Sequence, residues 1–165
     1  MSLFNRRTLL LSLTTLPLAA CGFSPVYRKG GAASSLYGTL RFNLIESREG
    51  FLLLEHVTAR LGPSNPAARF DVSLTMEITE DELVLTSTTS IIRHTLNGLI
   101  KLTVTDVESG EAVFTDKFRE TSGYSTNAQT AVSASAKRDA TDRLVQALAD
   151  MVVLRLSSTS ESWAA

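Results

Sequence analysis

Residues 70–79 read Phe-Asp-Val-Ser-Leu-Thr-Met-Glu-Ile-Thr, with an apolar side chain at every second position and a polar one between. Because successive side chains of a β-strand point to opposite faces of a sheet, this alternation predicts a strand with one buried and one polar face. The acids that follow, Glu80, Asp81 and Glu82, are expected to form a charged turn. The segment therefore indicates a sheet that is covered on one side only.

Three further segments carry a strand pattern. Residues 38–45 alternate in the same way, and a long extended stretch runs from about Leu83 to Asp106, with a break expected near residues 87–90. Glu108-Ser109-Gly110 predicts a hairpin turn into a last strand, Ala112–Thr121. The residues expected to face inward are Leu96, Ile100, Leu102 and Val104 on the long stretch and Ala112, Phe114 and Phe118 on the last strand, where Asp116 interrupts the pattern.

Two segments have the periodicity of amphipathic helices. The first is expected to begin near Ser47, with Glu49 in its first turn, and to stop at Gly62-Pro63. The second is expected to run from about Ala128 to Ser157. Its predicted buried stripe is Val132, Ala136, Ala140, Leu144, Ala147, Met151 and Leu154.

The order of these elements is β-α-β-β-β-α. The apolar faces of the sheet and of both helices are buried together if both helices cover the apolar face of the sheet. We therefore predict an α+β fold, a two-layer sandwich with an about four-stranded, mostly antiparallel sheet. The domain is expected to span residues 38–157, followed by a tail at 158–165. With 165 residues and 44% apolar side chains the chain fits one globular domain, and a formal charge of −1 argues against a nucleic-acid partner.

The first twenty residues have the layout of a secretory signal peptide. Arg6 and Arg7 provide a positive start, and an apolar stretch follows at residues 9–20, too short to span a bilayer. A buried first helix is the alternative, which Pro17 and the adjoining arginines disfavour. The arginine pair leaves both general secretion and twin-arginine export open.

The segment ends in Leu18-Ala19-Ala20-Cys21, which resembles the lipobox of bacterial lipoproteins. That resemblance implies that the thiol of Cys21 is acylated and that residues 1–20 are removed; several acyl chains give stable anchoring. Cys21 is the only cysteine, so it has no disulfide partner within the chain. Gly22 stands where inner-membrane lipoproteins carry Asp, which implies the outer membrane. Residues 21–37 are expected to form the lipidated start and a flexible tether.

The stretch Cys21-Gly22-Phe23-Ser24-Pro25-Val26-Tyr27 resembles the start of the LPS-assembly lipoprotein LptE family, in particular its alphaproteobacterial members. The element order, Arg93 before a long strand and Tyr124 before an Ala-rich helix are similar too. The resemblance implies a lipoprotein that plugs the LptD β-barrel, helps to assemble it and assists delivery of lipopolysaccharide to the outer leaflet. It would lie in the barrel lumen or face the periplasm.

The resemblance also implies contact with lipopolysaccharide, whose lipid A carries anionic phosphates. The basic strand residues that could pair with phosphate are Arg93, Lys101, Lys117 and Arg119. The alternative for these residues is a solvated face with solubility charges. Likewise, a polar sheet face can simply face water.

No catalytic, cofactor or metal motif stands out, so we expect no enzyme activity, no cofactor and no metal. His56 and His94 are isolated histidines, and the acids at 80–82 fit a solvated turn better than a cation site. Two other functions stay open. One is a binding module that assists an ABC-type lipid transporter, and the other is a lipid-anchored hydrolase.

Overall fold

The computed structural model describes residues 35–85, 91–126 and 130–164, without the side chains of 83–85, 91 and 130–132. The predicted signal peptide, Cys21, most of the tether and the break near 87–90 lie outside this part of the chain. The elements are β1 (Leu40–Phe42), α3 (Arg48–Leu61), β2 (Phe70–Leu85), β3 (Ile91–Asp106), β4 (Ala112–Thr126) and α4 (Thr130–Trp163).

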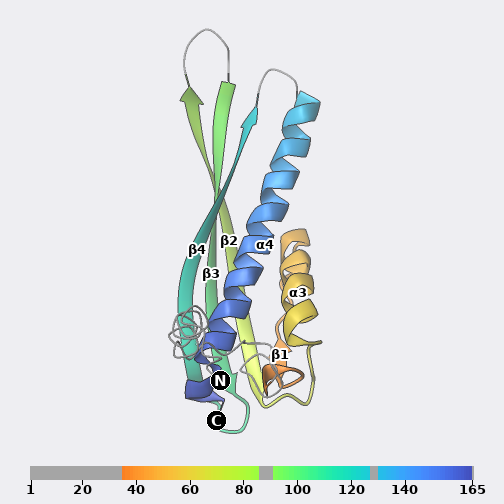
Figure 1. The fold of residues 1–165 in the computed structure, drawn as a ribbon, viewed down its shortest axis with the longest axis vertical. Helices are drawn as coiled ribbons and strands as arrows, with labels where there is room; N and C mark the ends of the chain where they lie inside the picture. The colour runs from red at the N-terminus through yellow and green to blue at the C-terminus, as the bar shows by residue number, and fades with distance from the viewer. Residues whose placement is uncertain (1–34, 86–90, 127–129, 165) are drawn as a thin grey trace, which may run out of the picture.

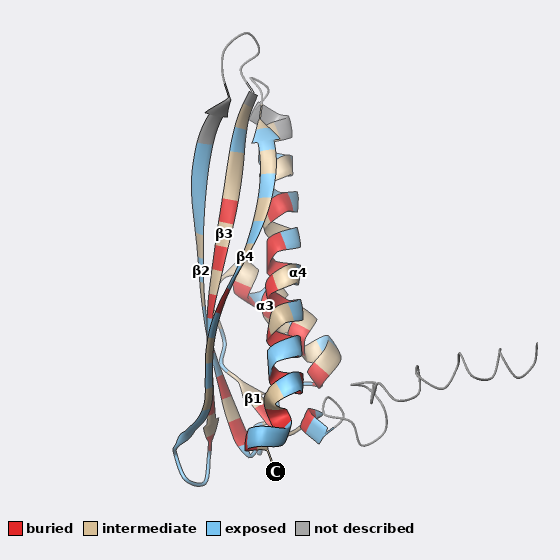
Figure 2. Ribbon diagram, turned by 60° about the vertical axis from the view of Figure 1, so that its left-hand side comes forward, coloured by how far each residue is buried: buried red, intermediate tan, exposed pale blue. Residues whose placement is uncertain are grey.

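The four strands form one sheet in the order β1-β2-β3-β4. β1 runs parallel to β2, whereas β2, β3 and β4 are antiparallel neighbours, so the sheet is mixed. Both helices lie on the same side of this sheet (Figures 1 and 2). The predicted α+β architecture with two helices on one sheet face is therefore confirmed.

The core lies between the sheet and the helices, and Figure 2 shows the buried residues where these layers meet. On β3, Leu96, Ile100, Leu102 and Val104 are buried as predicted. The α4 stripe differs from its prediction, because Leu154 is 54% exposed while neighbours that the prediction omitted are buried. The helix turns a wider surface to the core, made of Ala140, Leu144, Val145, Leu148, Ala149, Val152, Val153 and Leu156.

Helix α3 begins and ends where its sequence predicts. Ser47 is the N-cap, and its hydroxyl oxygen accepts a hydrogen bond from the Gly50 N–H at 2.9 Å, which satisfies a free donor of the first turn. At the other end Gly62 adopts φ 89°, a conformation that suits glycine, and its N–H bonds to the Thr58 carbonyl oxygen. Arg48–Asp142 and Arg60–Asp150 ion pairs join α3 to α4.

Glu80, Asp81 and Glu82 do not form the predicted turn. They belong to β2, which continues to Leu85 and pairs with β3 along its whole length. Extended backbone is tolerated here because the charges find partners on other elements: Glu80 pairs with Lys137, and Asp81 accepts a hydrogen bond from the Asn97 amide at 2.7 Å. A local run of acids is therefore not a turn signal in this chain.

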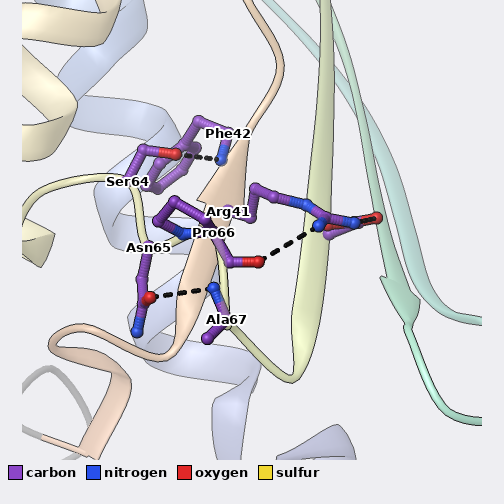
Figure 3. Close-up of polar contacts among 7 residues, drawn as sticks. Arg41, Phe42, Ser64, Asn65, Pro66 and Ala67 are labelled. Atoms are coloured by element: carbon purple, nitrogen blue, oxygen red, sulfur yellow. Dashed lines mark hydrogen bonds and ion pairs between the residues drawn. The ribbon is translucent and has the colours of Figure 1, made fainter.

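Strand β1 is shorter than the predicted segment 38–45, and Leu44 is 58% exposed. The α3–β2 loop secures β1 on its outer edge (Figure 3). The Phe42 N–H donates to the Ser64 hydroxyl at 3.0 Å, and the Asn65 N–H donates to the Leu40 carbonyl at 3.0 Å. Arg41 also reaches the Pro66 carbonyl (3.3 Å) while it pairs with Asp71.

The β3–β4 turn is confirmed, with Gly110 at φ 71°. A register shift follows it, and as a result Ala112 is exposed rather than inward-facing. Asp116 does face the helix side, as its place in the alternation requires. Its carboxylate pairs there with Arg155 of α4 at 3.3 Å, which explains an acid at this position.

The packed domain extends beyond the predicted bounds of 38–157 at both ends. Leu36 is fully buried in the core before β1 begins. Helix α4 continues to Trp163, six residues past the predicted end at Ser157, so most of the predicted tail is helical. Trp163 is held in the core by an edge-on contact with Phe70 at 5.1 Å between ring centroids.

Candidate functional site

The face of the sheet that the helices leave uncovered is polar at nearly all of its described positions. Because the even-numbered residues of β2 and β3 turn to the core, the odd-numbered ones point outward, and the register carries this face onto β4. We call it the outer face. Among its described residues at 71–81, 93–105 and 115–125, Leu99 is the one apolar side chain; the others are Ser, Thr, Asn, charged residues and Gly123.

Three of the four predicted phosphate contacts come together on the outer face. Lys101 on β3 lies directly opposite Lys117 on β4, and Arg119 is the next outward residue along β4. All three side chains are exposed. None of them forms an ion pair with another residue in the described part of the chain. These residues form a basic cluster that can accept an external anion.

Arg93 does not join this cluster. It is exposed on the same face but pairs with Ser125, eight residues along β3 from Lys101. At about 3.3 Å per residue that separation is ~26 Å, beyond the reach of one phosphate group. The sequence pattern put Lys117 and Arg119 on one strand face with Lys101 on the neighbouring strand, but it gave no position for Arg93 relative to them.

The outer face also carries negative charge, and this charge is confined to β2. Glu77 and Asp81 lie beside Arg119 around a hollow of about 420 Å³. On β3 and β4, by contrast, none of the described outward residues from Arg93 to Thr105 and from Thr115 to Ser125 is acidic. The outer face is therefore acidic along one strand and basic along the other two.

A second polar cluster lies on the helix side of the sheet, between β2, β3, β4 and α4. Glu80 accepts a hydrogen bond from the Tyr124 hydroxyl, approaches His94 Nδ1 at 3.1 Å and pairs with Lys137 Nζ at 2.5 Å. The His94 and Tyr124 rings stack at 4.5 Å between centroids. His94 Nε2 lies 3.0 Å from the Thr126 hydroxyl. Both ring nitrogens of His94 are thus engaged.

These contacts change the acidity of two groups in the cluster. Hydrogen bonds from Lys137 and Tyr124 lower the pKa of Glu80, because both stabilise the carboxylate. Burial, followed by the hydrogen bond to Glu80, raises the pKa of Tyr124 to about 12. The cluster therefore joins the sheet to α4 through an ionised Glu80 and a neutral Tyr124.

Among the other residues singled out by sequence, His94 and Glu80 belong to this second cluster, and His56 lies outside it. His56 is half-buried on α3. The acids at 80–82 alternate between the two faces of β2, and the described residues contain no group of three or more side chains placed to hold a metal ion. None of the helices in this part of the chain is long and apolar enough to cross a membrane.

The Glu80–Tyr124 contact is the feature that sequence reasoning missed. Its members are 44 residues apart, and they meet only because β2, β3 and β4 pair in one register. The available signal was Glu80 continuing the apolar face of β2, at the even position after Ile78. The assumption of a turn at that point concealed it.

No protein-family model and none of the curated proteins matches the chain. Solved structures do match. A protein from Caulobacter crescentus CB15 that is assigned as a lipoprotein aligns with a TM-score of 0.62 at 18% identity, covering 78% of this chain and 95% of that one. The fold is shared with bacterial lipoproteins.

Two more structures agree with that result. Rare lipoprotein B from Shewanella oneidensis has a TM-score of 0.55 at 15% identity and covers 74% of this chain and 94% of its own. A minor lipoprotein from Acinetobacter baumannii has a TM-score of 0.50 at 13% identity, with 74% and 92% covered. At these identities the likeness establishes the fold alone.

Proposed function

We propose that this chain is an outer-membrane lipoprotein, anchored through acylated Cys21, that plugs the LptD β-barrel and assists lipopolysaccharide delivery. The observation that carries the proposal is the outer face, whose described residues at 71–81, 93–105 and 115–125 are polar apart from Leu99. Large outer-membrane barrels have polar interiors, and a face of hydroxyls, amides and scattered charges matches such a wall. The role is accessory rather than catalytic.

The dimensions of the domain support this placement. β2 and β3 each have 16 residues, which corresponds to ~50 Å at about 3.3 Å per residue. The apolar band of an outer-membrane barrel is only about 25 Å tall, so the sheet is long enough to cross the lumen at that level. The described chain begins at the β1 end of the sheet (Figure 1).

The basic cluster indicates which ligand the protein would bind. Lys101, Lys117 and Arg119 lack internal anionic partners among the described ion pairs, and ammonium and guanidinium groups bind phosphate through charge-assisted hydrogen bonds. We assign the lipid A phosphates to this cluster. Arg93 is left out of the contact because it lies near the other end of β3.

The experiment is purification of the affinity-tagged mature protein from detergent-solubilised outer membrane, together with depletion of the protein in cells. Recovery with a large β-barrel, and loss of surface lipopolysaccharide on depletion, are expected. Recovery of the protein alone with normal surface lipopolysaccharide would remove the proposal. Recovery with an ATP-driven transporter would select the auxiliary-lipoprotein alternative.

A further inference from the structure

Strand β2 has an open edge beyond its short pairing with β1. The pairing ends at Val72, and the side chain of Asn43 then bonds both backbone groups of Leu74: its Oδ1 accepts from the Leu74 N–H at 2.6 Å, and its Nδ2 donates to the Leu74 carbonyl at 3.0 Å. Backbone groups alternate in direction along a strand. Those of Met76 and Ile78 therefore point to the same side as those of Leu74.

No described residue bonds to the backbone of Met76, Ile78 or Glu80 on that side. In Figures 1 and 2 the upper part of β2 forms the border of the sheet, with no helix or strand along its outer edge. The β1 end differs, because there Ser64 and Asn65 occupy the outward groups of the border strand (Figure 3). The fold covers one part of this border and leaves the other open.

A groove lies beside the open edge on the helix side. It has a volume of about 330 Å³ and is floored by Met76, Ile78 and Leu96. Its other lining residues are Ser47 and Glu49 at the start of α3, Thr79 and Glu80 of β2, and Lys137 and Thr141 of α4. Met76 and Ile78 are only half-buried, unlike Phe70, Val72 and Leu74 of the same strand. A strand placed along this edge would direct every second side chain into the groove.

The opposite side of the same edge is acidic. Glu77 and Asp81 are exposed on the outer face of β2, flanking the outward Thr79. The remaining side chains of an added strand would stand next to these carboxylates and would be favoured if basic. Two copies pairing through this edge would instead bring the acids of both together, which disfavours self-association.

We propose that the β2 edge from Met76 to Glu80 accepts an extended segment of a partner protein by β-strand addition, with apolar side chains toward the groove and basic ones toward Glu77 and Asp81. In this mode backbone hydrogen bonds provide affinity and the alternating side chains provide specificity. The inference does not depend on the barrel or on lipopolysaccharide, because the outer-face basic cluster lies on β3 and β4.

The test measures binding of a synthetic peptide of alternating valine and lysine to the mature lipidated protein in detergent, by fluorescence anisotropy. A valine–glutamate peptide is the charge control, and the same valine–lysine peptide with alternate backbone N-methyl groups is the hydrogen-bonding control. We expect the valine–lysine peptide to bind roughly tenfold more tightly than either control.

Two variants examine the edge itself. Ile78→Pro removes a backbone donor on the open side and leaves the hydrogen bonds to β3 in place, so it should abolish binding, whereas Ile78→Val should retain it. Glu77→Lys with Asp81→Lys should reverse the preference toward the valine–glutamate peptide. Circular dichroism checks the fold of each variant, and the charge-reversal variant decides the matter if Ile78→Pro does not fold.

Three results would overturn the proposal. The first is no saturable binding, or binding that both variants leave unchanged. The second is concentration-dependent self-association of the wild-type protein that Ile78→Pro abolishes, which would assign the edge to a second copy. The third is binding that appears only after deletion of residues 22–34, which would assign the edge to the chain's own N-terminal segment.

Discussion

Lys101 and Lys117 lie directly opposite each other on β3 and β4, both exposed on the outer face and neither in an ion pair within the described chain. Like charges at directly opposed positions oppose strand pairing, so the contact costs folding free energy. An anion bound between the two ammonium groups would offset this cost.

Replacing Lys117 with Thr therefore has two opposite effects. The free energy of unfolding should rise by about 0.5 kcal/mol, because a like-charge pair is removed. Affinity for purified lipopolysaccharide should fall about tenfold, since a charge-assisted hydrogen bond contributes ~1.5 kcal/mol. Urea unfolding and a direct binding titration measure the two quantities. Arg93→Thr is the matched control and should leave the affinity unchanged; equal losses in both variants would contradict a localised phosphate site.

The second polar cluster, around Glu80, makes the free energy of unfolding depend on pH. The folded-state pKa of Glu80 is lowered, so its contribution is present above its usual value of 4.5 and is lost as pH falls through the folded pKa. Glu80→Gln should cost about 1 kcal/mol at neutral pH, a modest figure because the pairs are partly exposed.

The comparison that checks this is urea unfolding of wild type and Glu80→Gln from neutral pH down to below the usual glutamate pKa. The difference between the two proteins should shrink in acid. Glu55→Gln, which removes an exposed carboxylate of α3 outside the cluster, is the matched control. A difference that stays constant with pH would mean that ionisation of Glu80 does not support the packing of α4.

The contact between β3 and α4 depends on Gly98. A Cβ at this position would lie 2.7 Å from Leu148 Cδ1, which would have to shift, and 3.3 Å from Leu144 Cδ1, which is also a tight contact; both leucines are fully buried. Gly98→Val should reduce the free energy of unfolding by about 2 kcal/mol through overpacking. Thermal unfolding measures this. Gly123→Ala, whose Cβ would meet its nearest atom at 3.4 Å, should be close to neutral.

Replacing Cys21 with Ala tests the anchor. Without a thiol to acylate, we expect the precursor to accumulate with residues 1–20 still attached. Immunoblotting of cell fractions, with mass spectrometry of the N-terminus, gives the result. Normal cleavage of the variant would indicate an ordinary secreted protein and would remove the lipid anchor from the account.

The alternation at 70–79 and the periodicity of α3 sufficed to predict the architecture, because patterns of period 2 and 3.6 report directly which face is buried. The same reasoning failed at Glu80, where tertiary partners on β4 and α4 neutralise a charge that the local pattern assigns to a turn. It failed again at Asp116, whose partner Arg155 lies on another element. Pairings between distant segments are not encoded in local periodicity.

The candidate site could likewise be predicted from the sequence only in part. Strand alternation placed Lys101, Lys117 and Arg119 on one face, but only the register brought the two lysines opposite each other. The open edge of β2 could not be predicted at all. It arises because β1 stops after three residues, and the sequence pattern at 38–45 predicted a longer strand.

The most direct test of the proposed role is site-specific photo-crosslinking in living cells. A photoreactive residue is placed at Thr103 or Thr121 on the outer face, and at Glu55 or Gln146 on the exposed helix surface as a control. We expect a covalent product with a large outer-membrane β-barrel from both outer-face positions and far less from the helix positions. Products from the helix positions alone, or with an inner-membrane transporter in place of a barrel, would contradict it.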